Sequence, residues 1–181
     1  MERYRIVFSG SGGQGVISAA IIFAEACVLF ENLNAVQSQV YGPAARGGSA
    51  RSDIIVSDSE INFPRVIQPN LLVCLTQKAY SNYYSILRPG GILVTDTHYV
   101  KTQKKVDARQ IELPMYKTVM GVTGKKVVLN MCMLGVVSEL TQLLKPVSLE
   151  KSIAAKFPFE LQEINKKALE LGIEMAKGTK N

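Results

Sequence analysis

A glycine-rich segment near the start of the chain, GSGGQG at residues 10–15, has the residue types of an anion-binding turn. It follows an apolar run and precedes a stretch typical of a buried helix, and its glycines fit the pattern G-x-G-x-x-G. Glycine lets a ligand approach the backbone, and the next helix directs free N–H groups and its positive dipole end at the loop. The segment therefore predicts an anion site, with a tight turn that binds nothing as the alternative.

Two common nucleotide ligands lack their usual partner residues here. An NAD site needs an acid at the end of the second strand to hold the ribose, but Glu31 precedes the predicted strand and Tyr41 follows it. A P-loop for ATP needs Lys and then Ser or Thr after its last glycine, and this chain has Val16 and Ile17 there. The sequence weakens the NAD hypothesis and excludes an ATP-binding P-loop.

A second loop, VYGPAARGGSAR at residues 40–51, follows the next predicted strand. In a parallel sheet both loops emerge at the carboxyl edge of the strands, where ligands bind. Arg46 and Arg51 add positive charge in a planar geometry that suits carboxylate or phosphate groups. The two loops together predict one ligand-facing edge, and a structured turn with solvated arginines is the alternative.

Few other residues could carry catalysis. The single histidine, His98, follows a predicted strand and could act as an acid or base, although a lone histidine beside a surface loop is more often inert. Cys27, Cys74 and Cys132 lie far apart in apolar segments, which predicts buried free thiols in a reducing, cytoplasmic setting. Their spacing fits neither an iron–sulfur cluster nor a zinc site. We therefore expect no catalytic residue and no metal site in this chain alone.

The elements that must position the loops alternate between strand and helix over residues 1–95, which favours an α/β sandwich with a mostly parallel sheet. The predicted strands lie at 4–9, 34–40, 50–56, 71–75, 92–95 and 110–113, with a short edge strand at 61–64. The predicted helices lie at 16–30, 77–87, 127–144, 149–155 (capped by Ser148) and 159–177.

Charge and hydropathy exclude two classes of partner. The net charge is +6, but no recognised nucleic-acid motif accompanies it, so we expect no nucleic-acid partner. No apolar run reaches the ~20 residues that cross a bilayer, so we expect no membrane partner. A solvated basic face or an acidic partner fits the charge better.

The two loops, together with NMCMLG at residues 130–135, resemble the gamma subunit of 2-oxoacid:ferredoxin oxidoreductases, above all the 2-oxoglutarate type. The resemblance extends from the first strand to the long helix and thins after about residue 144. It implies one domain over residues 1–181, a three-layer α/β/α sandwich with a mixed, mostly parallel sheet and a Rossmann-like first half. The RGG ending of the second loop favours the 2-oxoglutarate and branched-chain versions over pyruvate versions, which often carry RGAP there.

This family decarboxylates 2-oxoacids oxidatively, forms acyl-CoA and passes electrons to ferredoxin. The resemblance implies partner subunits of the alpha, beta and delta types, which would hold thiamine diphosphate, Mg²⁺ and [4Fe-4S] clusters, while this chain would contact coenzyme A only. Its cofactor-facing residues would be those of the two loops: Gly10, Gly12, Gly13, Gln14, Gly15, Tyr41, Gly42, Pro43, Arg46, Gly47 and Gly48. Asn130 and Gly135 would be helix-packing positions, and Gly135 would suit a subunit contact.

Two other functions stay open at this point. The strand–GxGxxG–helix order also fits a stand-alone Rossmann-like oxidoreductase that uses NAD(P). Alternatively, the chain is a purely structural assembly subunit whose glycine loops touch only protein. A homodimer is a further alternative for the isolated chain.

Overall fold

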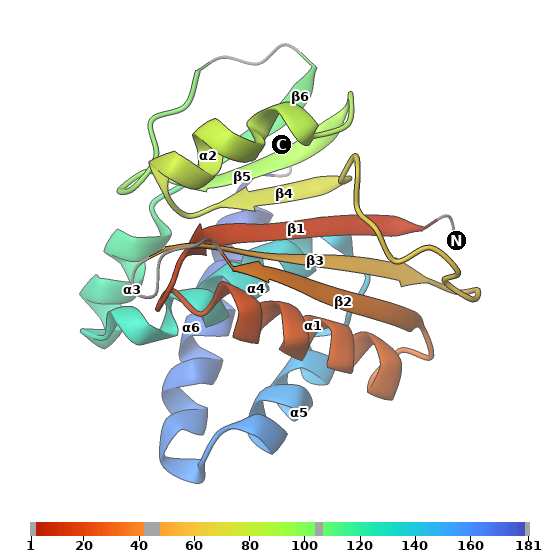
Figure 1. Ribbon diagram of the computed structural model, residues 1–181. Helices are drawn as coiled ribbons and strands as arrows, with labels where there is room; N and C mark the ends of the chain where they lie inside the picture. The colour runs from red at the N-terminus through yellow and green to blue at the C-terminus, as the bar shows by residue number, and fades with distance from the viewer. Residues whose placement is uncertain (1–2, 42–47, 104–106, 180–181) are drawn as a thin grey trace.

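The strands of the protein form one six-stranded sheet in the order β2-β3-β1-β4-β5-β6 (Figure 1). The computed structural model describes residues 3–41, 48–103 and 107–179. Its strands are β1 Tyr4–Ser11, β2 Asn34–Tyr41, β3 Ser49–Ser57, β4 Leu71–Cys74, β5 Gly91–Asp96 and β6 Ala108–Leu113. Its helices are α1 Val16–Phe30, α2 Gln77–Tyr83, α3 Met115–Thr123, α4 Leu129–Thr141, α5 Pro146–Lys156 and α6 Phe159–Lys177, with 3-10 turns at Tyr84–Ile86 and Lys126–Val128.

The sheet is mixed and mostly parallel, as predicted. β1, β4, β5 and β6 pair in parallel, whereas β3 pairs antiparallel with both β1 and β2. β2 therefore runs in the same direction as β1, and β3 alone is reversed. Because β3 lies between β1 and β2, the first half departs from a simple β-α-β crossover.

Helices cover both faces of the sheet and complete the three layers (Figure 1). The larger core buries α1, α3, α4, α5 and α6 against one face, around residues such as Ile6, Phe8 and Ile54. The smaller core buries α2 against the other face, around Val7 and Leu72. No helix in the described ranges is both long enough and apolar enough to span a membrane.

Helices α4 and α6 pack closely against each other through two glycines. A Cβ built on Gly135 would collide with the carbonyl oxygen of Leu169, and one built on Gly172 would collide with that of Cys132. Gly135 is thus a helix-packing position, but the close approach is made within the chain. The expectation that Gly135 suits a subunit contact is wrong for this reason.

Several predicted boundaries shift for local reasons. Residues 61–64 form no strand, since residues 62–64 are exposed and give the segment no buried face to hold it against the sheet. The long helix is shorter than predicted, because Gln142 adopts the left-handed conformation (φ 54°) and ends α4. α5 begins at Pro146, a favoured first helical residue, rather than at residue 149. Ser148 lies inside this helix and donates its hydroxyl to Glu31 instead of capping.

Candidate functional site

The glycine loop connects the end of β1 to the start of α1 in a backbone conformation that glycine favours. Gly13 and Gly15 have φ of 88° and 70°, and Gly15 is the N-cap of α1. No side chain in the described residues caps this helix, and its first intrahelical bond runs from the Ala19 N–H to the Gly15 carbonyl. The N–H groups of the first helical turn, which precede that bond, are therefore available to an anion.

Gln14 braces this loop from within the chain. Its Oε1 accepts the Ser11 N–H at 2.8 Å, and its Nε2 donates to the Leu75 carbonyl, just beyond β4, at 3.1 Å. Gly10 is buried beneath it, and a Cβ there would lie 2.5 Å from Gln14 Oε1. Gly10 and Gln14 thus hold the loop in shape, while Gly12 and Gly13 form its exposed surface.

Asn130, at the start of α4, supports the other side of the loop. It is buried, its Nδ2 donates to the Gly15 carbonyl at 3.4 Å, and a Cβ on Gly15 would collide with its side chain. The segment 130–135 therefore packs on segment 10–15. Sequence reasoning assigned both segments to one family pattern but missed this contact, which their separation by more than 100 residues conceals.

The second loop lies beside the first, at the same edge of the sheet, as we predicted from the sequence. Gly12 donates its N–H to the Gly48 carbonyl at 2.8 Å, and Ser11 pairs with Ser49 at the adjoining ends of β1 and β3. The backbone of Tyr41 ends β2 opposite Ala50. The other predicted loop residues, Gly42, Pro43, Arg46 and Gly47, lie outside the described residues.

Arg51 does not supply the free positive charge expected of it. Its guanidinium makes a two-point contact with the Asp53 carboxylate, at 2.6 and 2.8 Å, and lies 5.0 Å from the centre of the Tyr83 ring. Both charged side chains are largely buried. Arg51 and Asp53 are two residues apart in β3, so their side chains lie on the same face of the sheet. This spacing could have predicted the pair from the sequence.

Two hollows flank the glycine loop. One of about 270 Å³ lies on the side of β3, where Ala50 and the first turn of α1 line it. The other, of about 220 Å³, has apolar walls from Val127, Phe157 and Ile164, and Lys125 at its margin. Both include Gly13, Gly15 and Ser18, so a ligand on the loop can extend to either side.

His98 occupies a surface turn at the end of β5. Its ring stacks on Tyr116 with centroids 4.3 Å apart, and its backbone N–H donates to Asp96 at 2.8 Å. Asp96 is fully buried and also accepts the Tyr116 N–H at 2.6 Å; burial raises the pKa of its carboxyl. Asp96 therefore holds the turn and the start of α3, and His98 contributes ring packing.

The three cysteines of the chain lie in its interior. Cys27, Cys74 and Cys132 are buried and unpaired, as predicted, and burial raises the pKa of each to about 12. Within the described ranges, no group of three or more His, Cys, Asp or Glu residues could hold a metal ion.

Glu31 is directed away from the glycine loop. It accepts the Lys145 N–H at 2.9 Å and the Ser148 hydroxyl at 2.6 Å, beside the start of α5. The Ser148 hydrogen bond lowers the pKa of this carboxyl. Because the length of α1, roughly 22 Å at 1.5 Å per residue, separates Glu31 from the loop, it cannot hold a ribose there.

Known proteins resemble this chain in both sequence and fold. The family model described as pyruvate ferredoxin/flavodoxin oxidoreductase matches residues 5–175. A 2-oxoglutarate synthase subunit KorC from Methanocaldococcus jannaschii is 40% identical over 177 residues, which cover 97% of this chain and 95% of that protein. The crystal structure of a keto/oxoacid ferredoxin oxidoreductase gamma subunit from Geobacter sulfurreducens superposes with a TM-score of 0.91, at 35% identity and 100% coverage of both chains.

A longer protein shares the fold. The 2-oxoglutarate:ferredoxin oxidoreductase from Magnetococcus marinus, solved with 2-oxoglutarate, coenzyme A and succinyl-CoA bound, has a TM-score of 0.88 at 21% identity. The match covers 98% of this chain and 32% of that one. On the family match and the full-length likeness to the M. jannaschii subunit, this chain belongs to the pyruvate ferredoxin/flavodoxin oxidoreductase family.

Proposed function

We propose that this chain is the gamma subunit of a 2-oxoacid:ferredoxin oxidoreductase of the 2-oxoglutarate type, and that its two loops form part of the coenzyme A side of the assembled active site. The enzyme would convert a 2-oxoacid, CoA and oxidised ferredoxin to acyl-CoA, CO₂ and reduced ferredoxin. The observation that carries the proposal is the junction of the two loops at Gly12 and Gly48, in a chain that matches a 2-oxoglutarate synthase subunit over almost its whole length.

The loop geometry suits the phosphate groups of CoA. The helix N-terminus has no side-chain cap among the described residues, and Gly12 and Gly13 carry no side chain that would keep a ligand off the backbone. Arg46 of the second loop would add a charge-assisted hydrogen bond. Gln14 acts as a positioning residue in this account, because both ends of its amide already bind the backbone.

The chemistry itself belongs to partner subunits in this proposal. The three cysteines of this chain are buried in different elements with protonated thiols, so they are unsuited to share a [4Fe-4S] cluster. We assign the clusters, thiamine diphosphate and Mg²⁺ to subunits of the alpha, beta and delta types, and ferredoxin binding to the whole complex. We further propose that the complex is cytoplasmic.

The test is steady-state kinetics of the enzyme assembled by co-expression with alpha, beta and delta subunits from the same organism. The proposal predicts CoA-dependent ferredoxin reduction with 2-oxoglutarate in preference to pyruvate and 2-oxoisovalerate. Loss of one charge-assisted hydrogen bond costs about 1.5–3 kcal/mol, so Arg46→Ala should raise the KM for CoA about 10- to 150-fold and leave the KM for 2-oxoglutarate unchanged.

Two controls separate the alternatives. Arg46→Lys keeps the charge without the two-point fork and should fall between the parent and Arg46→Ala. An unchanged KM for CoA together with loss of subunits from the complex would favour the assembly-only alternative. Micromolar binding of NADH to the isolated chain, measured by calorimetry, would instead favour a stand-alone oxidoreductase.

A further inference from the structure

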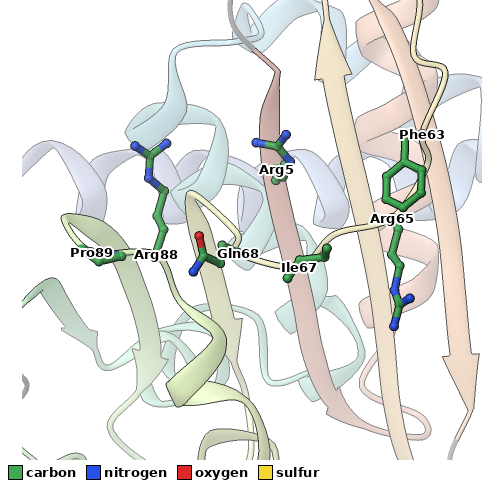
Figure 2. Close-up of a pocket in the computed structure, with 7 residues that line it drawn as sticks. All are labelled: Arg5, Phe63, Arg65, Ile67, Gln68, Arg88 and Pro89. Carbon is green, nitrogen blue, oxygen red and sulfur yellow. The ribbon is translucent and has the colours of Figure 1, made fainter.

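A basic cleft lies at the edge of the sheet opposite the glycine loops. It has a volume of about 580 Å³ and lies between the start of β1, the segment 63–68 before β4 and the turn before β5 (Figure 2). Three arginines, Arg5, Arg65 and Arg88, line it. Phe63 and Ile67 add apolar surface and are 57% and 62% exposed. The cleft thus combines positive charge with exposed large apolar side chains, and the function proposed above uses neither.

The backbone around this cleft is held in place by hydrogen bonds. The Arg5 N–H donates to Asn70 Oδ1 at 3.0 Å, and the Asn70 N–H donates to the Arg5 carbonyl at 2.8 Å. The Arg88 N–H donates to the Pro69 carbonyl at 3.2 Å. Val66 is buried in the smaller core, while its two neighbours in sequence are exposed. The exposed side chains therefore project from a fixed frame.

The three arginines lack carboxylate partners within the described part of the chain. The ion pairs found there use Arg51, Lys156, Lys166 and Lys177. Among the residues that the structure describes, no acidic one lines the cleft. Guanidinium groups that find no carboxylate among the described residues, beside exposed aromatic and aliphatic side chains, match the composition of protein interfaces, in which Arg and Phe are enriched.

The directions of the arginines indicate the shape of the partner. In Figure 2 the Arg5 and Arg88 side chains extend toward the same end of the cleft, whereas Arg65 extends the other way. Guanidinium groups that point in different directions suit an extended peptide with carboxylates at intervals better than one small anion. We propose that the cleft docks an acidic segment of a partner subunit, whose carboxylates meet these arginines and whose apolar side chains pack on Phe63 and Ile67.

This inference rests on the proposed function, since it takes the partner subunit from the assembled oxidoreductase.

The test uses the co-expressed complex with the double variant Arg5→Glu/Arg88→Glu. The control is Lys117→Glu/Lys167→Glu, which makes an equal charge change at exposed helical positions. The arginine variant should dissociate from the complex about 100-fold more readily in native mass spectrometry titrations. The control should match the parent, and the parent interaction should weaken with salt. A thermal melt of the isolated variant verifies that it folds.

A photo-crosslinking residue at position 68 identifies the occupant. The inference predicts crosslinks to an Asp- and Glu-rich segment of a partner subunit, and reversal of those acids to Lys should restore binding of the arginine variant.

Unchanged assembly of the arginine variant would overturn the inference, as would crosslinks confined to a neutral or basic segment. The arginine variant could also assemble normally while inorganic phosphate protects the cleft of the parent but not that of the variant. This result would assign the cleft to a small anion instead. If the parent complex shows no activity with any 2-oxoacid, the proposed function fails, whereas normal activity with unchanged assembly of the variant removes this inference alone.

Discussion

Asn130 packs directly on Gly15, and this contact fixes the glycine loop to the start of α4. The amide of Asn130 occupies the space that a side chain at residue 15 would need, and it donates to the carbonyl of the same residue. Gln14 fastens the other side of the loop to the residue after β4. The exposed surface of the loop at Gly12 and Gly13 is therefore supported by two buried or half-buried amides.

Replacing Gly15 by Ala should destabilise the chain more than replacing Gly13. Both residues have positive φ, so backbone strain costs about 1–2 kcal/mol in each variant. The collision with Asn130 adds about 1–3 kcal/mol at residue 15 alone, because nothing lies within 4 Å of a Cβ at residue 13. Urea unfolding of Gly13→Ala, Gly15→Ala and Gly15→Ala/Asn130→Ala measures the difference. Equal losses in the two single variants would show that the Asn130 contact is unimportant.

Alanine at Gly172 should be among the most damaging substitutions in the chain. Its Cβ would meet the backbone carbonyl of Cys132, which cannot move without separating α4 from α6, so we expect a loss above about 4 kcal/mol. Gly121→Ala is the matched control: this exposed glycine of α3 has open space around it, and helix propensity predicts a gain of about 0.5–1 kcal/mol. Thermal unfolding of both variants provides the measurement. A mild effect of Gly172→Ala would mean that the helices can separate cheaply.

Changing Gln14 to Glu should weaken the loop at neutral pH. The carboxylate can still accept the Ser11 N–H, but it cannot donate to the Leu75 carbonyl, so the loss should be about 1–3 kcal/mol. Protonation restores a donor, and the stability deficit relative to the parent should therefore shrink as the pH falls through the pKa of the new carboxyl. Denaturant unfolding at several pH values tests this, and a deficit that is independent of pH would argue against the donor role.

The Glu31 carboxylate gives a second pH-dependent prediction. Its folded-state pKa is lowered by the Ser148 hydrogen bond, so its stabilisation is present above the ordinary value of 4.5 and is lost as the pH falls through the lowered value. Glu31→Gln should lose the anion at the start of α5, about 0.3–1 kcal/mol at pH 7, and should equal the parent in strong acid. Glu25→Gln, which breaks an exposed ion pair with Lys156, controls for a generic surface charge. The same pH profile in both variants would contradict the role given to Glu31.

The sequence predicted the placement of the loops because strand ends are a local property. Glycines follow β1 and β2, and strands that share a direction bring such segments to one edge. The position of β3 between β1 and β2 could not be predicted, since strand order depends on the whole core. The same limit applies to the Ser148–Glu31 bond and to the contact between Gly172 and Cys132, because each joins residues that are distant in the chain. The Arg51–Asp53 pair could have been predicted from the sequence, because the two side chains lie on the same face of one strand.

Hydrogen–deuterium exchange of the assembled enzyme tests the central claim most directly. Peptides covering residues 10–18 and 41–50 report on the two loops, and peptides covering 62–69 report on the opposite edge of the sheet. The account predicts that CoA slows exchange in the two loop peptides and that 2-oxoglutarate alone does not, while the 62–69 peptide is unaffected by either. Unchanged exchange in both loop peptides, at CoA concentrations that saturate turnover, would contradict the placement of the loops on the coenzyme A side.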